Sequence, residues 1–81
     1  MELERIIELM KSEDYKDRFK AEYYQLEDRA TKLGNMLEKY KAGTLNFTPS
    51  CSYELLNSQL KAMNEYLQYL IIRAEIEGIE L

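Results

Sequence analysis

The sequence predicts an all-α protein: an antiparallel helical hairpin with a short N-terminal helix, assembling into a homo-oligomer. Two long stretches carry apolar residues at alternating spacings of three and four, which places those side chains on one face of an α-helix. The second stretch carries a further apolar stripe, whereas a surface helix of a small monomer needs only one. With 81 residues, the chain is expected to form a single helical-hairpin domain over residues 1–81. A core that small is marginal unless a partner subunit adds buried area.

The first expected helix is short and covers about residues 2–10. Leu3, Ile6, Ile7 and Met10 follow the spacing of one helical face. Because a helix of this length is marginal in water by itself, we expect it to dock on the hairpin or on a neighbouring subunit.

The second expected helix covers about residues 14–42, with Ser12 or Asp14 as the N-cap. Gly34 lies inside it and costs roughly 1 kcal/mol relative to alanine, a cost that close approach of another backbone would offset. Gly43 suits the C-terminal cap. Its apolar stripe consists of Phe19, Tyr23, Leu26, Ala30, Leu33, Leu37 and Tyr40.

The third expected helix covers about residues 49–77, with Thr48 as N-cap, Pro49 in the first position and Gly78 as the terminator. A short linker before it implies that the two long helices are antiparallel neighbours. Its core stripe is formed by Leu56, Leu60, Met63, Leu67, Leu70 and Ala74. Its second stripe is formed by Leu55, Gln59, Ala62, Tyr66, Tyr69, Arg73 and Ile76.

Composition argues against several classes of function. The chain has no histidine and a single cysteine, Cys51, so we expect no metal site, no cofactor and no catalytic site, and hence no enzyme. A net charge of −4 disfavours DNA or RNA as a partner. No apolar run approaches a membrane span, and the acidic N-terminus does not look like a secretory signal, so we expect a cytoplasmic protein without membrane contact.

One broad face of the predicted hairpin is polar and aromatic. The second helix contributes to it Arg18, Glu22, Gln25, Arg29, Lys32 and Met36, and the third helix contributes its second stripe. Tyrosine and arginine planes stack on nucleobases and cations neutralise phosphate, so this face suits a small nucleotide. Tyrosine, methionine and arginine are also enriched in oligomer interfaces. The simpler interpretations are packing for Tyr66 and Tyr69, an ion pair with Glu22 for Arg73, and solvated surface cations for Arg29 and Lys32.

Two half-patterns carry a family resemblance. They are Tyr15-x-x-Arg18-x-x-x-Glu22-x-x-x-Leu26, continuing to Lys32-Leu33, and Leu56-x-x-Gln59-x-x-x-Met63-x-x-Tyr66-x-x-x-Leu70-x-x-Arg73. Over about residues 14–78 the chain resembles the small phage helical-hairpin proteins of the anti-CBASS and anti-Thoeris nucleotide-sponge family. The resemblance implies a viral immune-evasion protein in the cytoplasm of the infected bacterial host. It also implies a homo-oligomer, with a hexamer favoured.

The same resemblance implies that the ligand is a cyclic oligonucleotide or a cyclic ADP-ribose-type signalling molecule, which is sequestered without being cleaved. It implicates as ligand-binding residues Tyr15, Arg18, Glu22, Gln59, Tyr66 and Arg73. The alternative is a small helical adaptor or oligomerisation protein that binds a host or phage protein and no nucleotide.

Overall fold

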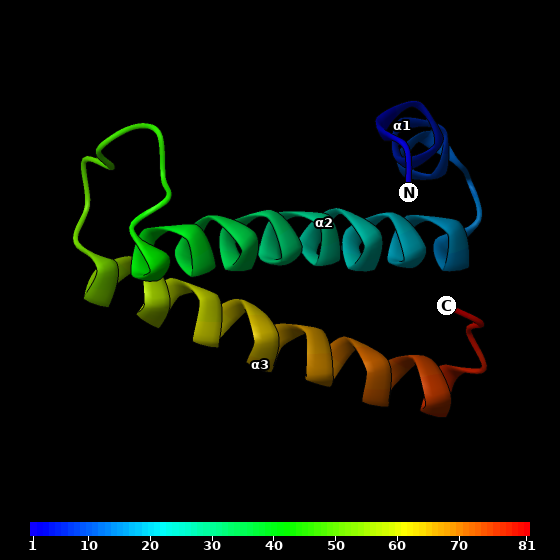
Figure 1. Cartoon of the computed structure of the whole chain (residues 1–81). Coiled ribbons are helices and arrows are strands. Elements are labelled where there is room, and N and C mark those ends of the chain that lie inside the picture. The colour runs from blue at the N-terminus through cyan, green and yellow to red at the C-terminus, as the bar shows by residue number, and fades with distance from the viewer.

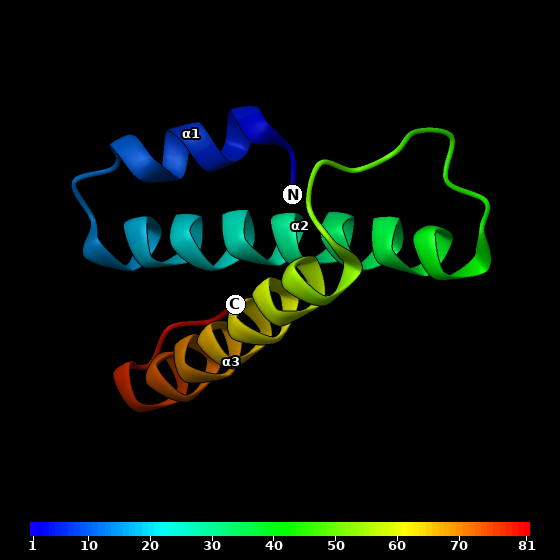
Figure 2. The same cartoon turned by 90° about the vertical axis from the view of Figure 1, so that its left-hand side faces the viewer.

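The computed structural model describes all residues, 1–81, and contains three α-helices and no strand. They are α1 (Leu3–Lys11), α2 (Tyr15–Ala42) and α3 (Tyr53–Glu77). The long helices α2 and α3 form an antiparallel hairpin, and α1 packs on the opposite side of α2 (Figure 1). Figure 2 shows that α1 runs alongside the N-terminal half of α2 and that α3 crosses α2 obliquely. The expected helical hairpin is therefore confirmed.

Short side chains and a glycine set the ends of α2. The Asp14 carboxylate accepts a 2.9 Å hydrogen bond from the backbone N–H of Lys16, so Asp14, rather than Ser12, is the N-cap. The Ser12 hydroxyl instead donates to the Asp17 carboxylate at 2.8 Å. Gly43 ends the helix with φ of 74°, the left-handed conformation that glycine adopts at least cost.

The start of the third helix differs from the expectation. It begins at Tyr53 rather than at Pro49, because the Ser52 hydroxyl accepts a hydrogen bond from the free backbone N–H of Leu55 and caps the helix there. Residues 43–52 form a longer linker that arches over the last turns of α2 (Figure 2). The ring of Tyr53 packs against that of Tyr40, with centroids 5.6 Å apart, so the first turn of α3 is held to the last turns of α2.

The core consists of two small clusters on opposite sides of α2. Where α2 meets α3, Phe19 packs with Leu70, Ala74 and Ile79, so the tail after Gly78 docks into the core. On the other side, α1 buries Ile6 and Leu9 against Ala21, with Tyr24 packed beside them. Of the two docking partners considered for the short helix, the structure therefore shows its own hairpin.

Gly34 does not meet another backbone. A Cβ at this position would have only the Leu60 side chain within reach, at 3.8 Å, an ordinary van der Waals distance. No backbone approach therefore offsets the cost of this glycine, because the group nearest to it across the helix interface is a leucine side chain.

The large apolar side chains of the second stripe of α3 are not covered by the rest of the chain. Its large side chains are exposed, up to 79% for Ile76, and with the neighbouring Ile72 they form what we call the α3 apolar face. This face consists of Leu55, Ala62, Tyr66, Tyr69, Ile72 and Ile76. Only nine of the 81 residues are buried, so much of the apolar surface remains open to another molecule. None of the three helices combines the length and apolar character that crossing a bilayer requires.

Candidate functional site

The candidate site lies along one polar stripe of α2. Its members recur at spacings of three and four, which puts them on a single helical face. They are Arg18, Glu22, Gln25, Arg29 and Lys32. The helices α1 and α3 pack on opposite sides of α2 (Figure 1). Stripe residues line hollows next to both of these helices, so the stripe lies between α1 and α3. Two hollows open along it, one toward α3 and one toward α1.

The hollow toward α3, which we call the α2–α3 hollow, has a volume of about 230 Å³. It is lined by Glu22, Gln25, Leu26, Arg29 and Tyr66. The Tyr66 hydroxyl donates a hydrogen bond to the Glu22 carboxylate across the two helices. Two of the six predicted site residues therefore meet here, in the same hollow as a guanidinium.

The hollow toward α1, the α1–α2 hollow, has a volume of about 460 Å³. It is lined by Met1, Glu2, Leu3, Ile6, Gln25, Asp28, Arg29 and Lys32. Within it, Lys32 forms a 3.0 Å ion pair with Asp28, one turn away on the same helix. Gln25 and Arg29 line both hollows, so these two side chains lie where the hollows adjoin.

Two more predicted residues, Tyr15 and Arg73, meet at the open end of the hairpin. Arg73 donates a 2.8 Å hydrogen bond to the Tyr15 hydroxyl and a 3.2 Å hydrogen bond to the Glu77 carboxylate. Its guanidinium carbon lies 5.0 Å from the centroid of the Phe19 ring, in a cation–π arrangement. The expected ion pair between Arg73 and Glu22 is therefore wrong. Glu77 is one turn away on the same helix, whereas Glu22 is engaged by Tyr66.

This cluster shifts two pKa values. The Glu77 carboxylate favours the protonated Tyr15 hydroxyl and raises the pKa of Tyr15, against the opposing effect of the Arg73 cation. Desolvation lowers the pKa of Arg73, but Tyr15 and Glu77 together raise it by more. Arg73 is thus firmly cationic and Tyr15 firmly neutral near pH 7.

The remaining two predicted residues lie apart from these groups. The Arg18 guanidinium donates a 2.9 Å hydrogen bond to the backbone carbonyl of Ser12, in the turn between α1 and α2. Gln59 is exposed on α3 and lines neither hollow of the stripe. The structure therefore divides the six predicted residues among two pairs and two separate positions.

Gln25 and Arg29 lie at the candidate site, although the family resemblance implicates neither of them. Arg29 is exposed, as expected of a surface cation, and it lines both hollows together with Gln25. The signal was present in the sequence, because Gln25 and Arg29 continue the helical face of Glu22 at spacings of three and seven.

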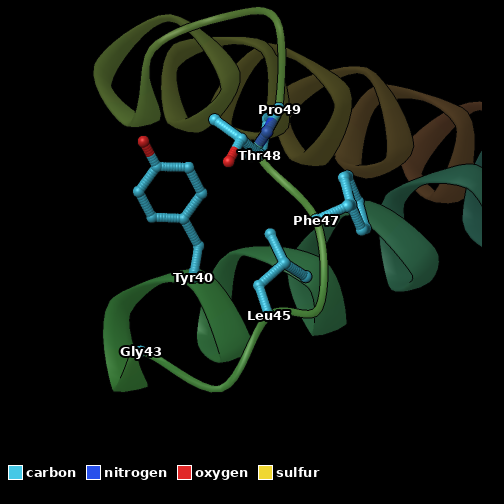
Figure 3. Close-up of a pocket in the computed structure, with 6 residues that line it drawn as sticks. All are labelled: Tyr40, Gly43, Leu45, Phe47, Thr48 and Pro49. Carbon is cyan, nitrogen blue, oxygen red and sulfur yellow. The ribbon is translucent and has the colours of Figure 1, made fainter.

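A third hollow lies at the closed end of the hairpin. It measures about 220 Å³ and is lined by Tyr40, Gly43, Leu45, Phe47, Thr48 and Pro49 (Figure 3). Its walls are half apolar and include no charged side chain. It lacks the cation that a phosphate needs, so the polar stripe of α2 is the better candidate for a charged ligand.

The fold and the site define a small all-α helical-hairpin protein with two adjoining hollows along an arginine-containing polar stripe of α2. Residues 13–76 match the family model described as Sequestin, and this match spans most of the chain, so the chain belongs to the Sequestin family. The family name denotes a sequestering protein, which agrees with the sequestering class that the sequence resemblance implied. Neither the curated proteins nor the solved structures give a significant match.

Proposed function

We propose that this protein is a viral immune-evasion protein that binds and sequesters cyclic nucleotide second messengers of bacterial anti-phage defence without cleaving them. Its ligand is a cyclic oligonucleotide or a cyclic ADP-ribose-type molecule, held in the cytoplasm of the infected bacterial host. Membership of the Sequestin family supports sequestration, and the resemblance to the anti-CBASS and anti-Thoeris sponges supports the class of ligand.

One observation carries this proposal: the α2–α3 hollow brings together the chemical groups that recognise a nucleotide. The Tyr66 ring offers a stacking surface, and the Glu22 carboxylate accepts hydrogen bonds from N–H groups. Arg29 offers a planar cation for a phosphate. Tyr15, Arg18, Gln59 and Arg73 are included in the proposed ligand set on the family resemblance.

The proposal includes a homo-oligomer, with a hexamer favoured. A sponge that competes with a host receptor needs nanomolar affinity, about 12 kcal/mol of binding free energy. The α2–α3 hollow, at about 230 Å³, is smaller than the roughly 300 Å³ at which typical ligand pockets begin. Tyr66 belongs both to this hollow and to the α3 apolar face, so a second copy docked on that face would enclose the ligand.

The test is thermal denaturation in a panel of 3′,3′-cyclic GMP–AMP, cyclic tri-adenylate and cyclic ADP-ribose isomers, with linear AMP as the control. A ligand that binds only the folded protein stabilises it by RT ln(1 + [L]/Kd), so the true ligand raises the melting temperature and linear AMP does not. Mass spectrometry after denaturing the complex should recover the ligand intact. Recovery of a cleaved product would instead indicate an enzyme.

Arg18→Ala and Arg73→Ala separate the residues taken from the resemblance. Truncating a donor to a desolvated phosphate weakens binding by about 10-fold or more. If both variants keep the oligomer size and affinity of the parent, neither arginine contacts the ligand, and the site is confined to the α2–α3 hollow.

The second candidate function is an adaptor that binds a host or phage protein and no nucleotide. The α3 apolar face favours it, because exposed apolar patches of this kind also mark protein–protein interfaces. No thermal shift with any member of the panel, together with capture of one specific protein that Ile76→Glu abolishes, would establish the adaptor instead.

A further inference from the structure

Arg29 differs from the other arginines in having no partner within the protein. Of the four arginines in the chain, Arg5 pairs with Glu8, Arg18 donates to the Ser12 carbonyl and Arg73 is held by Tyr15 and Glu77. No hydrogen bond or ion pair of the structure involves Arg29, even though acidic residues lie close by on its own helix. The nearest carboxylate in sequence, Asp28, is paired with Lys32.

The position of Arg29 gives this free guanidinium a specific environment. It lines both the α2–α3 hollow and the α1–α2 hollow, and Gln25, one turn earlier, does the same. A guanidinium and an amide on adjacent turns present several N–H donors in one direction. That arrangement matches the oxygens of a phosphodiester, which arginine binds with two parallel hydrogen bonds.

The opposite end of the α2–α3 hollow has different chemistry. Glu22 lies seven residues before Arg29, about 10 Å along the helix, and accepts the hydrogen bond of Tyr66. A carboxylate repels phosphate but accepts hydrogen bonds from base amino groups, and the half-exposed Tyr66 ring offers a face for stacking. The two ends of the hollow thus differ, with a carboxylate and an aromatic ring at one end and a guanidinium and an amide at the other.

We infer that Gln25 and Arg29 bind the phosphate of the ligand, and that Glu22 and Tyr66 bind its base. The inference rests on the proposed function and deepens it by naming the phosphate contact and the ligand class: a phosphodiester-linked purine nucleotide whose base presents N–H donors. The phosphate would then bind Arg29, which has no competing partner within the protein. Arg18 and Arg73 would first have to give up the hydrogen bonds that they make within the protein.

The test follows the Nε–H resonances of the four arginines by NMR while 3′,3′-cyclic GMP–AMP is added to the full-length protein. The signal of Arg29, identified by its loss in Arg29→Lys, is expected to shift more than the other three. Larger shifts for Arg18 or Arg73, with Arg29 unchanged, would overturn the inference and leave the proposed function standing. Absence of binding by every nucleotide of the panel would instead overturn the proposed function, and the inference with it.

Affinity measurements provide a second test of the role of Arg29. Arg29→Ala is expected to weaken nucleotide binding by about 10- to 100-fold, whereas Lys61→Ala, which removes the same charge outside the hollows, leaves it within about twofold. Because Arg29 makes no intramolecular hydrogen bond, its replacement should leave the melting temperature of the free protein unchanged, and this separates loss of binding from loss of fold. Equal affinities for the two variants would contradict the inference.

A base-directed variant tests the other half of the site. Glu22→Gln is expected to weaken cyclic di-GMP more than cyclic di-UMP, because guanine presents both an amino group and a ring N–H to the carboxylate. An equal loss for both ligands would show that Glu22 does not contact the base.

Discussion

Arg73 donates a 2.8 Å hydrogen bond to the hydroxyl of Tyr15, which lies 58 positions earlier in the chain. The same guanidinium lies over the Phe19 ring and pairs with Glu77, so it ties the last turns of α3 to the first turn of α2. Arg73 therefore links α2 and α3 at the end of the hairpin that is opposite the 43–52 linker. A ligand phosphate at this arginine would compete with those contacts, whereas one at Arg29 would not.

Replacing Glu77 should lower the pKa of Tyr15. Because Glu77 raises that pKa, the neutral hydroxyl is favoured in the folded protein. The contribution of this protonated Tyr15 hydroxyl to the free energy of unfolding is complete below the pKa of tyrosine in the unfolded chain. It is lost as the pH rises through the higher pKa of Tyr15 in the folded protein. In Glu77→Gln, NMR of the tyrosine ring carbons should show Tyr15 ionising at lower pH.

Tyr23 provides the matched control for this titration. Burial, followed by its 3.1 Å hydrogen bond to Glu27, raises the pKa of Tyr23. Glu27→Gln should therefore lower the pKa of Tyr23 and leave Tyr15 unchanged, and Glu77→Gln should do the reverse. A Tyr15 titration that does not respond to Glu77→Gln would show that the cluster does not persist in solution.

Two glycines should respond in opposite ways to alanine. Gly34 lies inside α2 with room for a Cβ, so Gly34→Ala is expected to raise the free energy of unfolding by up to about 1 kcal/mol. Gly43 has a φ of 74°, so Gly43→Ala is expected to lower it by about 1 kcal/mol. Urea denaturation followed by circular dichroism measures both. Destabilisation by Gly34→Ala would mean that α3 approaches α2 more closely than the structure shows.

Truncating Leu70 should destabilise the fold strongly. Leu70 is 1% exposed and packs with Phe19, Ala74 and Ile79, so Leu70→Ala is expected to lower the free energy of unfolding by about 2 to 5 kcal/mol. Leu3→Ala removes the same atoms at a site that is 63% exposed and should cost less than about 0.5 kcal/mol. Similar losses for both variants would place the core elsewhere.

A charge on the α3 apolar face should reduce the oligomer. Ile76→Glu puts a carboxylate at the most exposed large apolar residue of that face, and burying it between subunits would require costly desolvation. Sedimentation velocity at micromolar concentration should show a smaller species than the parent. Asn64→Glu adds the same charge on another side of α3 and should leave the oligomer intact. A parent that is already monomeric would remove the proposed oligomer.

The amino-acid pattern specifies the helices of this protein and most of their ends. The apolar stripes at spacings of three and four specify two long helices, because only a period near 3.6 brings those side chains to one face. Asp14 and Gly43 cap α2 as local hydrogen bonding and backbone freedom require. The same periodicity places Glu22, Gln25 and Arg29 on one stripe, and this follows from their spacing alone.

The partners of the residues in that stripe follow from helix packing and not from the pattern. This packing pairs Glu22 with Tyr66, holds Arg73 at Glu77 and Tyr15, and leaves Arg29 free between two hollows. It also docks α1 on its own hairpin. These contacts depend on the crossing angle and axial rotation of packed helices, which arise from the interlocking of side chains across the interface. A repeat within one helix specifies the face that is buried, but not the residue that it meets.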